Sequence, residues 1–104
     1  DARLEKASVR ASVEADEPVC PLPLFSGYQA NIKSKVEDLK NHAGRAGGAI
    51  TAALFLSHFT NGIPWAHLDI AGPSYTEHEH RADTPYGGTG VGVRLLARYL
   101  QGLV

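Results

Sequence analysis

Apolar residues recur with helical spacing near both ends of the chain. Residues 2–15 predict a surface helix with a thin apolar stripe. That stripe consists of residues three or four apart: Leu4, Ala7, Ala11 and Ala15. We expect the helix to end before Pro18, because a proline disfavours helical geometry in the residue before it. Residues 91–104 predict a second, amphipathic helix. Arg94, Arg98 and Gln101 would point to solvent, and five residues would form the buried face: Leu95, Leu96, Tyr99, Leu100 and Leu103.

The middle of the chain is more hydrophobic. Residues 49–59 carry no charge and are apolar on nearly every side, which predicts a helix buried all round, with Leu54 and Phe55 in the core. The glycine-rich residues 41–48 before it predict a loop that needs unusual backbone angles. A chain of 104 residues has difficulty covering such a helix on every side. We therefore expect the fold to be incomplete.

Three further segments have their own patterns. Residues 18–24 hold three prolines and predict an extended connector, followed by a short helix over residues 25–35 with Ser26 as N-cap. The connector would insert Val19, Leu22 and Leu24, and the helix would present Tyr28, Ile32 and Val36 on one face. After a turn at residues 61–64, residues 65–70 alternate and predict a strand with Ile70 in the core. Residues 74–90 are polar without a period and predict a long loop.

Composition limits the class of protein. A length of 104 residues allows one domain or part of one, and 43% hydrophobic residues are typical of a folded chain. The net charge of -1 argues against a general nucleic-acid binder, and no apolar run approaches the roughly 20 residues of a membrane helix. A single cysteine cannot form an intramolecular disulfide. Because the sequence contains no Met, we expect it to be a piece of a longer protein.

Two motifs suggest polar catalysis or metal binding. His67, Asp69 and Ser74 could form a serine triad, but alternate residues of a strand are about 6.6 Å apart, too far for a direct hydrogen bond. Buried, satisfied polar groups are the better interpretation. Residues 77–80 (EHEH) offer imidazole and carboxylate ligands that suit zinc. No further ligand is placed by spacing, so a solvated loop tip is favoured.

Two other motifs are also ambiguous. The glycine-rich residues 87–92 precede a helix, as a phosphate loop would, but no lysine follows. A turn with Thr89 as N-cap of the helix is favoured. Cys20 with His42 could imitate a cysteine nucleophile. Because nothing near Cys20 would activate it, a small buried hydrophobic residue is the better interpretation.

Residues 65–72 (WAHLDIAG) resemble the signature near the C-terminus of the leucyl aminopeptidase (cytosol aminopeptidase) family. Other blocks resemble this family in the same order along essentially the whole chain: residues 17–19, 22–24, 38–41, 47–53, 55–56, 88–90, 93–94 and 96. Eight consecutive matching residues together with ordered blocks make the resemblance specific.

The resemblance implies an α/β fold, in which residues 1–104 form the C-terminal part of an aminopeptidase α/β sandwich with helices packed on a mixed sheet. It also implies a cytoplasmic, homohexameric exopeptidase that removes N-terminal residues from peptides. Two divalent metals, zinc or manganese, would activate a water and polarise the scissile carbonyl. We expect neither nucleic acid nor a membrane as partner.

The resemblance implies that the metal ligands and catalytic residues lie upstream of this stretch, so no catalytic or metal-binding residue is expected in this chain. Arg45 is not the family's catalytic arginine. Only Ala71 and Ser74 correspond to positions that line the pocket for the substrate's first side chain; the other interpretation is a plain strand-end turn. As a whole, the chain could instead be a non-catalytic interaction or pseudoenzyme module that keeps the scaffold only.

Overall fold

A computed structural model describes residues 1–36, 38–41, 43–78, 82 and 84–104. These residues form two compact units. Unit 1 combines Asp1–Cys20 with Leu68–Val104, and unit 2 is the intervening segment, Pro21–His67. No helix in the described part of the chain is long and apolar enough to cross a membrane.

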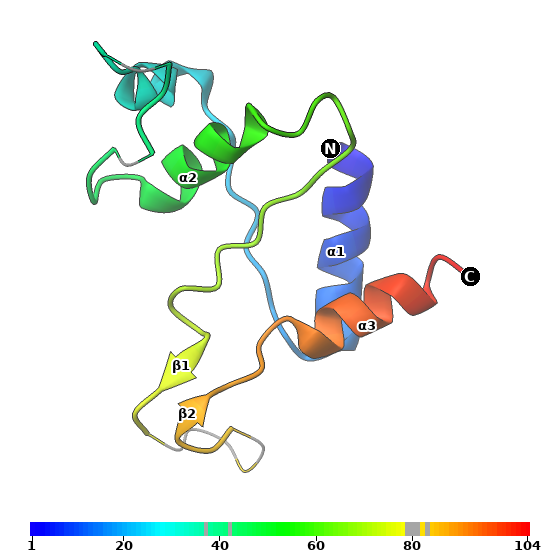
Figure 1. Ribbon diagram of the computed structural model, residues 1–104. Coiled ribbons are helices and arrows are strands. Elements are labelled where there is room, and N and C mark those ends of the chain that lie inside the picture. Colours follow the sequence, from blue (N-terminus) through cyan, green and yellow to red (C-terminus); the bar gives the residue numbers. More distant parts are fainter. Residues whose placement is uncertain (37, 42, 79–81, 83) are drawn as a thin grey trace. The chain divides into compact units, whose positions relative to one another are not determined.

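Unit 1 contains the helices α1 and α3 (Figure 1). Helix α1 spans Ala2–Glu14, and the Asp1 side chain caps it by accepting hydrogen bonds from the N–H groups of Arg3 and Leu4. Helix α3 spans Val93–Gln101 and packs against α1. Ala11 of α1 and Leu95 of α3 are only 4% and 2% exposed. Both terminal helices are thus confirmed, including the end of the first before Pro18.

The buried face predicted for the last helix is largely wrong. Leu95 is buried and Tyr99 is half-buried, because α1 covers that side of α3. The other three residues of the predicted face are exposed: Leu96, Leu100 and Leu103. Arg94 and Arg98 do reach solvent, but each also forms an ion pair with a glutamate, Arg94 with Glu17 and Arg98 with Glu14.

A small hairpin completes unit 1. Strand β1 (Tyr75–Thr76) pairs antiparallel with β2 (Gly87–Gly88), with Tyr75 opposite Gly88 and Thr76 opposite Gly87. The prediction of a structureless loop over residues 74–90 was therefore wrong. Because β2 consists of two glycines, it has no side-chain alternation from which a strand could have been predicted.

Unit 2 is built from the 3-10 helix η1 (Ser26–Ile32) packed against α2 (Gly48–Ser57). Its core contains Ile32, Ala53 and Leu54, each no more than 5% exposed. Gly47 begins α2 with a φ of 62°, as expected of the glycine-rich loop. The helix is confirmed, but its burial on every side is not: Phe55 is only half-buried, and Leu56 and Phe59 are exposed.

The segment before η1 also differs from its prediction. Leu22 and Leu24 are exposed instead of inserted, and Val19 is half-buried. The expected helix over residues 25–35 is a shorter 3-10 helix, and no side chain caps its start at Ser26. Its expected face is incomplete, because Ile32 is buried whereas Tyr28 and Val36 are exposed.

The strand predicted over residues 65–70 does not form. No described residue pairs with this segment in a ladder, and Ile70 is 43% exposed, not in the core. A strand is defined by its hydrogen-bonded neighbours as well as by its own alternation. The described sheet consists of β1 and β2 alone, so the alternation has no ladder to join.

Candidate substrate-pocket turn

Residues 69–74 in unit 1 form a tight turn held by local hydrogen bonds. The Asp69 carboxylate accepts the N–H of Ala71 at 3.0 Å, a common way for a short acidic side chain to shape a turn. The N–H of Ser74 donates to the carbonyl of Ile70 at 2.9 Å, and the Ser74 hydroxyl donates to the carbonyl of Ala71 at 3.3 Å. The turn therefore brings Ala71 and Ser74 together, with Ala71 exposed and Ser74 half-buried.

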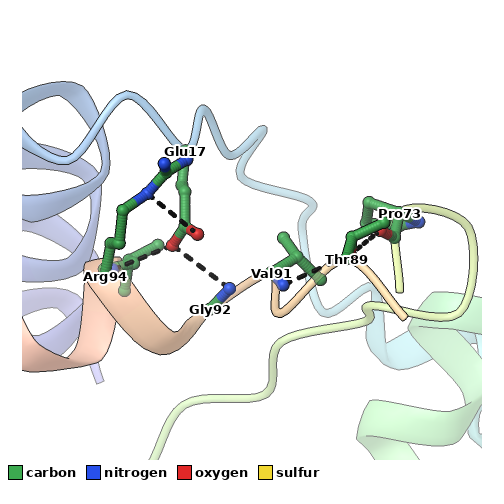
Figure 2. A network of polar contacts seen from close by, with 7 residues as sticks. Glu17, Pro73, Thr89, Val91, Gly92 and Arg94 are labelled. Atoms are coloured by element: carbon green, nitrogen blue, oxygen red, sulfur yellow. Dashed lines mark hydrogen bonds and ion pairs between the residues drawn. The ribbon is translucent and has the colours of Figure 1, made fainter. Parts of the chain in front are cut away.

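Thr89 connects this turn to the segment that leads into α3. Its N–H donates to the carbonyl of Ser74 at 3.0 Å, and its hydroxyl donates to the carbonyl of Pro73. The same hydroxyl accepts the N–H of Val91 at 3.3 Å (Figure 2). Thr89 is thus not the N-cap of α3, as the sequence suggested. The capping position belongs to Gly92, whose φ is 90°.

The start of α3 is held by a carboxylate from the other end of the chain. Oε2 of Glu17 accepts the N–H groups of Gly92 at 3.1 Å and Leu95 at 2.8 Å, and Oε1 lies 3.5 Å from Nε of Arg94 (Figure 2). Glu17 is 8% exposed. A carboxylate at a helix N-terminus satisfies unpaired N–H groups and complements the helix dipole. These amides, which a phosphate loop would offer to its ligand, are occupied by Glu17.

Sequence reasoning missed Glu17, since 75 residues separate it from Gly92. A capping carboxylate is normally sought within three residues of the helix start. The position of Glu17 in a block that resembles the aminopeptidase family was the one available signal.

Comparison with known proteins identifies the family. Residues 1–97 match the cytosol aminopeptidase family, catalytic domain. The chain belongs to this family. It is 48% identical over 101 residues to a probable cytosol aminopeptidase from Roseiflexus castenholzii. The matched region covers 97% of this chain and 21% of the relative. A probable cytosol aminopeptidase from Syntrophotalea carbinolica is 47% identical, over 94% of this chain and 20% of the relative.

Solved structures agree with this aminopeptidase assignment. The cytosol aminopeptidase from Coxiella burnetii superimposes with a TM-score of 0.84 at 40% identity, covering 98% of this chain and 22% of that protein. The bottromycin maturation enzyme BotP in complex with Mn superimposes with a TM-score of 0.92 at 46% identity. The match covers 99% of this chain and 23% of BotP. The chain therefore has the fold of an α/β aminopeptidase segment. It spans about one fifth of the length of the curated relatives it matches.

The described residues of this aminopeptidase segment do not provide a metal site. No three His, Cys, Asp or Glu side chains among them come together in a way that could hold a metal ion. Of residues 77–80, Glu79 and His80 lie outside the described residues. Glu77 and His78 are exposed, and the backbone of His78 exchanges two hydrogen bonds with the Thr76 hydroxyl.

The residues of the possible serine triad make other contacts. Asp69 and Ser74 each bond to the backbone of Ala71. The expectation that they are buried was wrong, because Asp69 is exposed and both His67 and Ser74 are half-buried. Cys20 is exposed, which corrects the expectation of a buried residue, and His42 lies outside the described residues. The absence of a catalytic residue from this part of the chain remains a prediction.

Next to the turn, two exposed tyrosines form a pair. The rings of Tyr75 and Tyr86 meet edge to face with centroids 5.9 Å apart. A hydrogen bond with Tyr86 raises the pKa of the Tyr75 hydroxyl above its ordinary range, because it stabilises the protonated phenol. The pair lies on the hairpin that continues directly from Ser74.

Proposed function

We propose that this chain is the C-terminal part of the catalytic domain of a binuclear-metal leucyl aminopeptidase, which hydrolyses N-terminal residues from peptides. The observation that carries the proposal is the family match over residues 1–97. The resemblance implies that two divalent metals, zinc or manganese, would be held by residues upstream of this chain. The full-length enzyme would be a cytoplasmic homohexamer.

Within that enzyme, this segment supplies scaffold and part of the substrate pocket. Ala71 and Ser74 line the pocket for the substrate's first side chain. Their place on one turn supports the assignment, since Ser74 reaches the carbonyl of Ala71 and Ala71 is exposed. Both side chains are small, which leaves room for a group as large as leucine.

The decisive experiment extends the coding sequence upstream of Asp1 and assays the resulting protein. We expect it to hydrolyse leucine amide, to lose this activity with a chelator, and to regain it when zinc or manganese is added. A natural protein that lacks an upstream carboxylate- and lysine-containing metal site, and that is inactive with either metal, would instead be the non-catalytic interaction module.

A further inference from the structure

We propose that Thr89 is a positioning residue for substrate selection: its hydroxyl and N–H fix the turn that carries Ala71 and Ser74. The inference rests on the proposed function, because it assigns a role in the same pocket. Thr89 itself contacts the turn and is not proposed to touch the substrate.

The first observation is that the bonds within the turn are local. Asp69, Ile70 and Ala71 bond to residues two to four positions away. Such bonds determine the shape of a turn, but they do not fix its direction relative to the rest of the fold. A pocket wall needs both, because a small displacement of a positioning group costs much of its effect on substrate orientation.

The second observation is that Thr89 links the turn itself to a distant part of the chain, beside the pairing of β1 with β2. Its hydroxyl reaches the carbonyl of Pro73, 16 residues earlier in the chain, and its N–H reaches the adjacent carbonyl of Ser74 at 3.0 Å. Two bonds from one residue to consecutive carbonyls fix both the position and the orientation of the Pro73–Ser74 backbone. Ser74, a proposed pocket residue, is thereby held directly.

The third observation is that Thr89 is itself held by the segment that leads into α3. The N–H of Val91 donates to its hydroxyl at 3.3 Å, and the next residue, Gly92, donates to the Glu17 carboxylate (Figure 2). The chain from Thr89 thus runs directly into the capped start of α3. The turn is consequently connected to the packed pair of helices α1 and α3. Leu95, in the first turn of α3, is buried.

In this arrangement the hydroxyl of Thr89 fixes the turn, since it bonds to both Pro73 and Val91. Serine keeps the hydroxyl and loses only a methyl group. Valine keeps the β-branched shape that restricts the side-chain rotamer but has no donor or acceptor. The two substitutions therefore separate hydrogen bonding from shape.

The experiment measures kcat/KM for leucine and alanine p-nitroanilides in the full-length enzyme with Thr89→Val and Thr89→Ser. We expect Thr89→Val to lower the leucine-to-alanine ratio about five- to tenfold, the effect of losing a typical hydrogen bond. The side chain of an alanine substrate is too short to reach the pocket wall formed by Ala71 and Ser74, so its kcat/KM should depend little on Thr89. Thr89→Ser should keep the ratio within about twofold of wild type.

Thr60→Val is the matched control. The Thr60 hydroxyl also donates to a carbonyl, that of Ser57 at 2.9 Å, but at the end of α2 in unit 2. The leucine-to-alanine ratio of kcat/KM in Thr60→Val should equal that of wild type. Because the ratio does not depend on the concentration of active enzyme, general destabilisation does not alter it. If Thr89→Val does not accumulate, Thr89→Ala removes the same hydroxyl and carries the same expectation.

Three outcomes overturn the proposal. One is an unchanged ratio in Thr89→Val or Thr89→Ala while wild type is active. The second is an equal change in Thr89→Ser, which would assign the effect to the methyl group. In the third, wild-type enzyme loaded with metal does not hydrolyse either substrate, and then the proposed function fails as well.

Discussion

Glu17 concentrates several favourable interactions on one carboxylate. It accepts two amide hydrogen bonds at the start of α3, lies beside Arg94, and is almost fully buried. Hydrogen bonds to a charged acceptor are stronger than neutral ones, and an anion at a helix N-terminus gains from the helix dipole. Glu17 thus links the end of α1 to the beginning of α3.

Replacing Glu17 by glutamine should lower the free energy of unfolding by about 1–2 kcal/mol, because the amide can accept hydrogen bonds but carries no charge. Glu14→Gln is the control, since its ion pair with Arg98 is exposed and should contribute less than about 1 kcal/mol. Urea unfolding followed by far-ultraviolet circular dichroism measures both. Equal losses for the two variants would contradict the capping role of Glu17.

At Ala71, a larger side chain should alter substrate selection. In the full-length enzyme, Ala71→Leu would fill the room that a leucine side chain needs. It should therefore disfavour leucine amides relative to alanine amides by about 1–3 kcal/mol. Metal content should stay constant, because neither Ala71 nor Ser74 is a proposed ligand. An unchanged ratio of kcat/KM values in the metal-loaded enzyme would remove Ala71 from the pocket.

The Tyr75–Tyr86 pair predicts a pH dependence. Since the hydrogen bond raises the pKa of Tyr75 in the folded state, its stabilising effect is present below the ordinary tyrosine pKa. The effect is lost as pH rises through the raised value. Tyr86→Phe should return the Tyr75 titration to the ordinary range, as followed by NMR of 13C-labelled tyrosine rings. Tyr28→Phe should not affect it, because Tyr28 pairs with Phe25 in unit 2.

At the scale of the element, α2 shows how burial depends on what surrounds a helix. Its sequence is apolar on nearly every side, yet only part of its surface is covered. Thr51, Ala53 and Leu54 are buried, whereas Leu56 is 44% exposed. Two leucines of one helix thus lie in different environments, which makes them a natural comparison.

Leu54→Ala should lower the free energy of unfolding of unit 2 by about 2–5 kcal/mol, the range for a leucine removed from a packed core. Leu56→Ala removes the same atoms from an exposed position and should cost less than about 1 kcal/mol. Trp65, the one tryptophan of the chain, lies in unit 2 and reports urea unfolding by fluorescence. Similar losses at the two positions would mean that Leu54 is not in the core.

Elements that depend on local sequence could be predicted, and those that depend on distant partners could not. Both terminal helices follow from spacing within one segment, and α2 follows from an uncharged run that is apolar on nearly every side. The turn at residues 61–64 follows from Asn61 and Gly62, which both take positive φ. The hairpin was missed because Gly87 and Gly88 have no side-chain pattern. Residues 65–70 have the pattern of a strand but no neighbouring strand among the described residues.

The candidate site follows the same division. Ala71 and Ser74 were singled out by resemblance to the family, not by their own chemistry, and that role is a proposal. Thr89, which holds their turn, bonds to Pro73 across 16 residues, and Glu17, which holds the start of α3, bonds to Gly92 across 75. Patterns within a short stretch of sequence do not show hydrogen bonds between residues so far apart.

For the molecule as a whole, we expect the 104-residue chain by itself not to hydrolyse leucine amide, even with zinc or manganese. The resemblance to the family carries only pocket positions into this sequence, and a water needs a complete set of metal ligands to be activated. The assay compares the purified chain with the full-length enzyme in the presence of each metal. Turnover by the chain that a chelator abolishes would contradict this expectation.

The division into units also has a consequence for synthesis. Unit 2 is one continuous segment, so it can fold as soon as residues 21–67 have left the ribosome. Unit 1 joins segments on both sides of unit 2, and the bond from Leu95 to Glu17 spans 78 residues. Helix α1 is therefore made before α3 and cannot pack against it until translation has passed residue 101. Chain elongation at about 5–20 residues per second separates the synthesis of the two helices by several seconds.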